Sequence, residues 1–249
     1  MFKNFVSISS IILLIIFGFG FSEVKAGWLM VEEDGSQTMI SEGKMKNFSE
    51  GWGTIMDGTS GEITLYSENS KLYFKGKIEE YCTETHAMVE ESLNSLTPEM
   101  REMVEQMKTE KTGTGERKIS IDKRGNGEEI AGFKTTKYSI MVDGEIYEEL
   151  WLAADAQLLK DYKPLIGLLT ELTKCTSSMD NEEFLSSHPG YLMLFEQGVI
   201  LKSLKNEDGE TKIQTNVVEL QKMDISSDEF EVPSGYKRAE FKELMSGEM

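Results

Sequence analysis

The strongest constraint on the fold is a series of short runs in which apolar and polar residues alternate, each ending at a turn signal. The clearest turn is Asp143-Gly144, which separates KYSIMV from EIYEELWLA. An Asp-Gly pair between two alternating runs is typical of a two-residue β-hairpin. The segment NEDGE at 206–210 separates VILKSL from TKIQTNVVELQKM in the same way. Alternation with a period of two indicates antiparallel strands with one buried face.

Roughly ten strands of this kind are predicted. They include Trp28–Glu33, Ser36–Met45, Gly61–Ser67, Lys71–Lys75 and Lys118–Asp122, followed by the segment GNGEE and a strand from Ile130 to Val142. In the strand after Asp143-Gly144, alternation places Tyr147 and Trp151 on one face and Ile146, Leu150 and Leu152 on the other. Both faces are apolar, so this strand should be covered on both sides.

Helical periodicity appears in two regions, residues 83–109 and residues 163–198. In the first, Pro98 is predicted to begin a new helix. The residues that follow at a spacing of i, i+3, i+4 and i+7 form one apolar stripe: Met100, Met103, Val104 and Met107. In the second, the stripe consists of Leu165, Leu168, Leu169 and Leu172.

The order of these segments is strands, helices, strands, helices and strands, without βαβ alternation. A sheet of about ten strands curls or closes rather than staying flat. The predicted fold class is therefore mainly β (α+β), with a single curved antiparallel sheet forming an incomplete barrel. Helical insertions are expected to cover its concave face.

The N-terminal segment predicts export. An apolar run extends from Phe5 to Phe21, and Val24 and Ala26 stand at −3 and −1 of a possible cleavage site before Gly27. We therefore expect residues 1–26 to be a cleaved secretory signal and residues 27–249 to form a single half-barrel domain, located in the periplasm or secreted. The alternative is an uncleaved N-terminal anchor, although the run is short for a membrane span.

The chain contains 26 basic and 44 acidic residues, for a formal net charge of −18. A surface of this charge repels nucleic acid and anionic lipid head groups, so no nucleic-acid partner is expected.

Cys82 and Cys175 are the two cysteines of the sequence. One pair in an exported chain suggests a disulfide. Two free, buried thiols are the alternative, because sequence alone does not establish the geometry of a pair.

Few residues suggest catalysis or metal binding. In CTETHAMVE, Cys82, His86 and Glu90 would share one face of a helix and could meet a zinc ion, but a structural zinc site takes four ligands. The two histidines do not support a Ser–His–acid triad. The sequence contains no G-x-G-x-x-G, P-loop or G-x-S-x-G motif. We therefore predict no catalytic residues, no metal site, no cofactor and no enzymatic activity.

Two stretches carry a family resemblance. IAGFKTTKYSIMVDGEIYEELWLAADAQLLKD (Ile130–Asp161) and SSDEFEVPSGYKRAEF (Ser226–Phe241) resemble the central hairpin and the closing segment of an uncharacterised family of exported bacterial proteins. That family is similar to the superfamily of the periplasmic lipoprotein carrier and its outer-membrane receptor (LolA/LolB-like). The resemblance implies an incomplete barrel plugged by helices, with a hydrophobic cavity for acyl chains. None of the carrier's functional residues can be matched here.

The predicted function is therefore binding of a hydrophobic or lipidic ligand in the half-barrel cavity, as an envelope carrier or chaperone. The candidate cavity residues are Met100, Met103, Val104, Met107, Leu165, Leu168, Leu169, Leu172 and Trp151. The methionine stripe fits either a flexible lid or a plain core stripe. The alternative function is a protein-binding envelope sensor without a small-molecule ligand. A continuous cavity favours the carrier, whereas a filled core with an exposed apolar edge favours the binding module.

Overall fold

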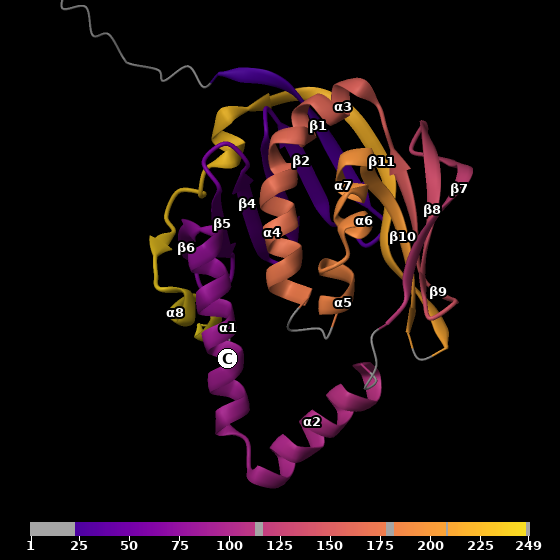
Figure 1. Ribbon diagram of the computed structural model, residues 1–249. Helices are drawn as coiled ribbons and strands as arrows, with labels where there is room; N and C mark the ends of the chain where they lie inside the picture. Colours follow the sequence, from indigo (N-terminus) through magenta and orange to yellow (C-terminus); the bar gives the residue numbers. More distant parts are fainter. Residues whose placement is uncertain (1–22, 113–116, 178–181, 208, 248–249) are drawn as a thin grey trace, which may run out of the picture.

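The structure is a computed structural model that describes residues 23–112, 117–177, 182–207 and 209–247 (Figure 1). Twelve strands form one sheet in the order β12-β6-β5-β4-β3-β2-β1-β11-β10-β9-β8-β7. The strands are β1 (Val24–Glu32), β2 (Gln37–Ser41), β3 (Lys44–Ser49), β4 (Trp52–Asp57), β5 (Glu62–Ser67), β6 (Leu72–Lys77), β7 (Ile119–Ile130), β8 (Phe133–Val142), β9 (Glu145–Ala153), β10 (Val199–Glu207), β11 (Glu210–Ser226) and β12 (Lys237–Arg238). Among the described pairings, β12 with β6 is parallel and the others are antiparallel.

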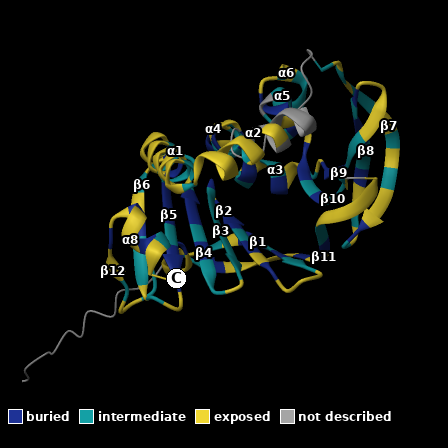
Figure 2. Ribbon diagram, turned by 90° about the horizontal axis from the view of Figure 1, so that it is seen from below, coloured by how far each residue is buried: buried dark blue, intermediate teal, exposed yellow. Residues whose placement is uncertain are grey.

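The sheet is strongly curved, and helices cover its concave side (Figures 1 and 2). The helices are α1 (Ile78–Ser95), α2 (Pro98–Thr112), α3 (Ala156–Tyr162), α4 (Ile166–Ser177), α5 (Glu183–Ser186), α6 (Pro189–Leu192), α7 (Leu194–Gln197) and α8 (Phe241–Ser246). Two 3₁₀ turns, η1 (Lys163–Leu165) and η2 (Ser227–Phe230), complete the described helical segments. The predicted fold class, an open antiparallel half-barrel with helical insertions, is confirmed.

Strands β6 and β7 follow one another in the chain but lie near opposite ends of the sheet, with β12 beyond β6. The connection between them is the helix pair α1 and α2. Helix α2 therefore crosses the open side of the half-barrel, from the end of α1 toward β7 (Figures 1 and 2). Within the described residues, no helix is sufficiently long and apolar to cross a membrane.

The main core lies between the concave face of the sheet and α3 and α4. Trp28 and Ile40 face it from β1 and β2, and Leu158 and Leu165 face it from α3 and η1. Leu158, Leu165 and Ile40 are fully buried. Asp155 begins α3 as its N-cap, because its carboxylate accepts hydrogen bonds from the next backbone N–H groups of the helix.

Two close contacts join the helical layer to the sheet. The backbone N–H of Gly43, in the β2–β3 turn, donates a 3.0 Å hydrogen bond to the carbonyl of Asp161. Gly58 lies so close to Pro164 that an added Cβ would stand 2.2 Å from the Pro164 carbonyl oxygen. Glycine at position 58 therefore allows the two backbones to meet.

Several predicted strand limits are corrected. The predicted strand Ser36–Met45 is divided into β2 and β3 by a turn at Glu42-Gly43, where both residues have positive φ, 49° and 76°. Positive φ at both central residues is the geometry of a tight hairpin turn. Strand β4 was not predicted. The segment GNGEE belongs to β7, which passes through it with two register shifts, and the turn instead lies at Ala131-Gly132.

The hairpin predicted at Asp143-Gly144 is confirmed, with φ of 54° and 90°. The hairpin between β10 and β11 is confirmed by the pairing of Glu207 with Glu210. The last residues of the predicted signal, Val24–Ala26, pair with β11 as part of β1. Residues 1–22 lie outside the described part of the chain, so cleavage before Gly27 stays a prediction.

The predicted disulfide is confirmed. Cys82 in α1 is bonded to Cys175 in α4, with a Cα–Cα distance of 5.6 Å and a sequence separation of 93 residues. The bond attaches the helix that follows β6 to the helix that fills the concave face. The loop between the cysteines contains α2, β7, β8, β9 and α3.

We expect loss of this disulfide to lower the free energy of unfolding by about 4 kcal/mol, because a long loop gains entropy in the unfolded chain. Urea denaturation of the Cys82→Ser/Cys175→Ser variant measures the loss. Wild type in excess reductant is the control and should behave like the variant. A loss below about 1 kcal/mol would contradict the stabilising role.

Candidate ligand-binding surface

The leucines predicted to line a cavity pack into the core instead of facing an open space. Leu165 and Leu168 are buried, at 0% and 5% exposure, against the concave face of the sheet. Leu169 and Leu172 are half-buried and pack at the edge of the same core cluster. The concave side next to α4 is therefore filled by side chains.

Trp151, the remaining candidate of the sheet, is 6% exposed and belongs to the same core cluster. The Nζ atoms of Lys137 and Lys202, its neighbours on β8 and β10, lie 4.5 and 5.0 Å from the centroid of its indole ring. A cation over an indole face is attracted by the ring quadrupole. This arrangement stabilises the sheet and leaves little of Trp151 for a ligand.

The methionine stripe of α2 does not pack as a core stripe. Met100 and Met103 are 51% and 60% exposed, and Val104 is half-buried. The side chain of Met107 lies outside the described residues. Helix α2 crosses the open side of the half-barrel (Figure 2), so Met100 and Met103 are exposed apolar side chains on that helix.

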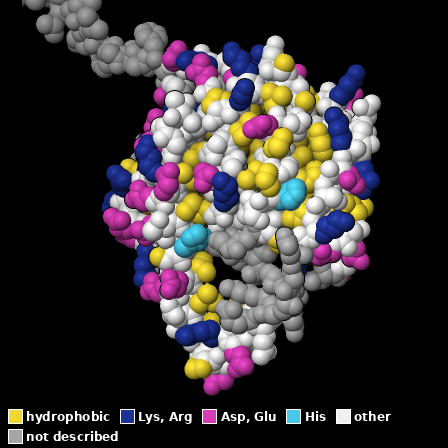
Figure 3. Space-filling view, viewed as in Figure 1, with side chains coloured by type: hydrophobic (Ala, Val, Ile, Leu, Met, Phe, Trp, Pro, Cys, Tyr) yellow, Lys and Arg dark blue, Asp and Glu magenta, His cyan; other side chains and the backbone are white. Residues whose placement is uncertain are grey.

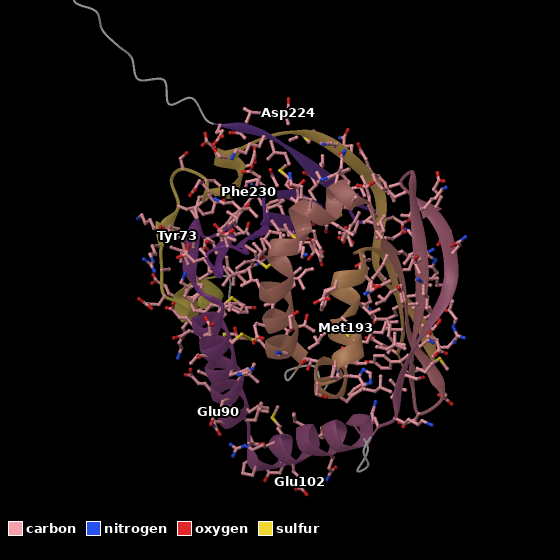
Figure 4. The ribbon with its side chains drawn as sticks, turned by 45° about the horizontal axis from the view of Figure 1, so that its top comes forward. Tyr73, Glu90, Glu102, Met193, Asp224 and Phe230 are labelled. Atoms are coloured by element: carbon pink, nitrogen blue, oxygen red, sulfur yellow. A yellow bond between two sulfur atoms is a disulfide. The ribbon has the colours of Figure 1, made fainter. Side chains whose placement is uncertain are left out.

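An open groove of about 710 Å³ lies on the helical layer. We call it the α3–α7 groove; its lining residues are Ala156, Leu159, Lys160, Lys163, Ile166 and Glu196. Leu159 and Ile166 are half-buried and contribute to the edge of the main core. Hydrophobic side chains gather on this face of the molecule (Figure 3). Met193, which is 54% exposed, lies on the same side, among the helices (Figure 4).

A polar cluster lies where β9 faces α5 and α6. In the β8–β9 pairing, Ile140 is opposite Glu148 and Met141 is opposite Ile146, so Tyr147 is the extra residue of a β-bulge. A bulge turns its side chain relative to regular alternation. Tyr147 therefore packs with the cluster of Leu150 and Leu152, which corrects the prediction that it shares a face with Trp151.

Two carboxylates of this polar cluster accept hydrogen bonds from tyrosines. The Tyr147 hydroxyl donates to Glu182 at 2.7 Å, and the Tyr191 hydroxyl donates to Glu148 at 3.4 Å. Lys205 of β10 forms an ion pair with Glu182 and a second, at 3.2 Å, with Glu207. Glu182 precedes α5 and Tyr191 lies in α6, so these bonds hold both short helices to the sheet.

The ionisation of this cluster is strongly perturbed. Burial, and secondarily the charge of Glu182, raises the pKa of Glu148 to about 7, although Lys205 opposes the shift. Burial raises the pKa of Tyr147 and of Tyr191 above the ordinary value. Burial lowers the pKa of Lys205, but its contact with Glu182 outweighs that effect and the pKa is raised. Glu148 is thus the member that titrates near neutral pH.

We expect Glu148→Gln to stabilise the protein at high pH. Glu148 binds its proton more tightly when folded than when unfolded, so stability falls as pH rises from about 4.5 to about 7. Glutamine cannot ionise and avoids this loss, which amounts to at most about 3 kcal/mol. Urea denaturation across this pH range measures the difference.

The variant Glu145→Gln, at the exposed start of the same strand, serves as the control. A difference between Glu148→Gln and wild type that stayed constant from acid to alkaline pH would show that ionisation of Glu148 is not its cause.

Of Cys82, His86 and Glu90, which the sequence suggested as possible zinc ligands, the first two make other contacts in the structure. The sulfur of Cys82 is bonded to Cys175, and Nε2 of His86 lies 3.2 Å from the carbonyl oxygen of Cys175. Across the described ranges, no group of three or more His, Cys, Asp and Glu side chains is placed to hold a metal ion.

The exposed position of α2 can be tested by measuring the stability of variants in its methionines. We expect Met100→Gln and Met103→Gln to change the free energy of unfolding by less than about 0.5 kcal/mol, because both side chains are exposed. Leu168→Ala, the matched core substitution, should cost about 2–5 kcal/mol. Thermal and urea unfolding of the three variants measure this. If either methionine variant lost as much free energy of unfolding as Leu168→Ala, α2 would have to pack onto the sheet or the other helices.

The comparison with curated proteins found no match to this chain. A family described as a domain of unknown function (DUF4412) matches residues 99–236, which is more than half of the sequence. The matched region contains nearly all of α2 and all of the α3–α7 groove, together with the polar cluster of β9, β10, α5 and α6. The chain therefore belongs to the DUF4412 family, whose function is not established.

Proposed function

We propose that this protein binds a hydrophobic ligand reversibly in the α3–α7 groove. The supporting observation is the groove itself, which has a volume of about 710 Å³ and is lined in part by the apolar side chains of Leu159 and Ile166. This volume lies within the range of about 300–1,000 Å³ that is typical of small-molecule sites. The groove belongs to helices that are packed on a continuous sheet, which gives a rigid support.

The apolar pattern of α4 supports this position. Leu168, and Leu165 of η1 just before the helix, are buried against the sheet, while Ile166 and Leu169 are only half-buried. A helix that is apolar on more than one face is normally covered on more than one face. The sheet covers one face of α4, and a bound apolar ligand would cover part of another.

The proposal includes export and a non-enzymatic role. Support for export comes from the signal-like N-terminal segment and from the disulfide, which forms in oxidising compartments. The resemblance to the LolA/LolB-like superfamily agrees with an open half-barrel that carries a lipid. In this protein, however, the described leucines of the concave side are packed, so the proposed ligand lies on the helical layer.

A second candidate function is binding of another protein through α2. The favouring observation is the exposure of Met100 and Met103 on a helix that crosses the open side of the half-barrel. Methionine stripes adapt to varied apolar partners. The two functions use different residues, so substitutions separate them.

The test is a titration with N-phenyl-1-naphthylamine, a neutral dye that fluoresces in apolar surroundings. We expect saturable binding to wild type and a roughly tenfold weaker affinity for Ile166→Gln, which loses apolar contact. Ala156→Trp, at an exposed position that lines the groove, should weaken binding by obstructing it, without disturbing the core.

The control variant Met103→Gln should bind the dye as wild type does. Absence of dye binding to wild type, or equal binding by all variants, would contradict a ligand site in the groove. Loss of binding in Met103→Gln alone would instead assign the apolar site to α2.

A further inference from the structure

We infer that the ligand of the α3–α7 groove is a single-chain amphiphile with an anionic head group, such as a long-chain carboxylate. This inference rests on the proposed function and specifies the chemical class of its ligand. The groove carries two lysines next to its apolar wall, and among the described residues neither forms an ion pair.

Lys160 and Lys163 stand on the groove in α3 and η1, and both are exposed. Within the described residues, neither forms an ion pair. Other lysines of the helices do: Lys174 lies 2.8 Å from Glu171, and Lys242 lies 2.6 Å from Glu91. Lys160 and Lys163 therefore keep their charge available to a ligand.

The apolar and charged residues of the groove are adjacent along one surface. Leu159, Lys163 and Ile166 are spaced i, i+4 and i+7, so they follow one side of the continuous helical segment from α3 through η1 to α4. Lys160 is next to Leu159 in sequence and also lines the groove. A ligand with its chain on Leu159 and Ile166 would place its head group within reach of the two ammonium groups.

The charges favour an anion over a cation. Two lysines and one carboxylate, that of Glu196, line the groove, whereas the whole chain carries a net charge of −18. An anionic ligand is repelled by most of this surface, and the local lysines provide the attraction that it needs. The same net charge opposes docking on an anionic membrane, which favours a free amphiphile.

The experiment measures displacement of N-phenyl-1-naphthylamine by dodecanoate, dodecanol and dodecyltrimethylammonium, below their micellar concentrations. At about pH 8 the carboxylate is ionised. We expect dodecanoate to bind roughly tenfold more tightly than dodecanol, as two partly exposed ion pairs would provide, and the cationic amphiphile to bind most weakly.

In Lys160→Gln/Lys163→Gln, the preference for dodecanoate over dodecanol should fall to about twofold or less, with the affinity for dodecanol unchanged. Glu196→Gln is the matched control of opposite sign, and it should strengthen binding of dodecanoate. High salt should reduce the preference in wild type but not in the double lysine variant.

Equal affinity for the carboxylate and the alcohol, with no effect of the lysine variants, would overturn the assigned head group while hydrophobic binding persisted. Failure of the dye to bind wild type would refute the proposed function itself. Lysine-dependent binding to vesicles of anionic phospholipid, without displacement of the dye by dodecanoate, would overturn the free amphiphile in favour of a membrane surface.

Discussion

The packing of α3 and α4 into the curved sheet is the contact on which the rest of the structure depends. An open antiparallel sheet of this size must cover its apolar concave face, and Leu158, Leu165 and Leu168 do so with almost no exposed surface. The close approach of Gly58 to Pro164 and the disulfide of Cys82 with Cys175 attach this layer at two further places. The positions of α1 and of the groove both follow from that packing.

The filled concave side changes where a ligand could bind. Leu168 of α4, which would line a hollow barrel, instead belongs to the core. Leu159 and Ile166, which are only half-buried, line the α3–α7 groove. Such a groove is open to solvent and can exchange its ligand without unfolding of the sheet. Charged side chains at its rim can then contribute to selectivity, because an apolar wall distinguishes poorly between ligands of similar size.

The polar cluster of β9 and β10 shows how a β-bulge changes which side chains of a strand form hydrogen bonds with the helical layer. One extra residue, Tyr147, changes the side-chain direction in β9, and Glu148 and Tyr147 then bond Tyr191 and Glu182 of the helical layer. The half-buried Glu148 carboxylate accepts a hydrogen bond from Tyr191 of α6, a short helix that contacts α7 beside the proposed groove. Glu148, with a pKa raised to about 7, therefore titrates at a contact between the sheet and the helical layer that carries the proposed groove.

The sequence by itself determined the class of fold. Alternating runs and turn pairs such as Asp143-Gly144 predict strands and hairpins because both are local properties of the backbone. The two helical regions and the cysteine pair were also predictable, since periodicity and residue count are visible in one chain. The limits of β2, β3 and β7 were less accessible, because bulges and positive-φ turns also occur at residues with no strong turn signal.

Tertiary structure decided the candidate site. Whether Leu168 lines a cavity or fills it depends on how closely the helix approaches the sheet, and that distance is set by contacts far apart in sequence, such as Gly58 with Pro164. The partnership of Tyr147 with Glu182 spans 35 residues and has no signal in local pattern. Local sequence specifies backbone preference, whereas burial, pKa and the shape of a groove arise only when distant segments share the same space.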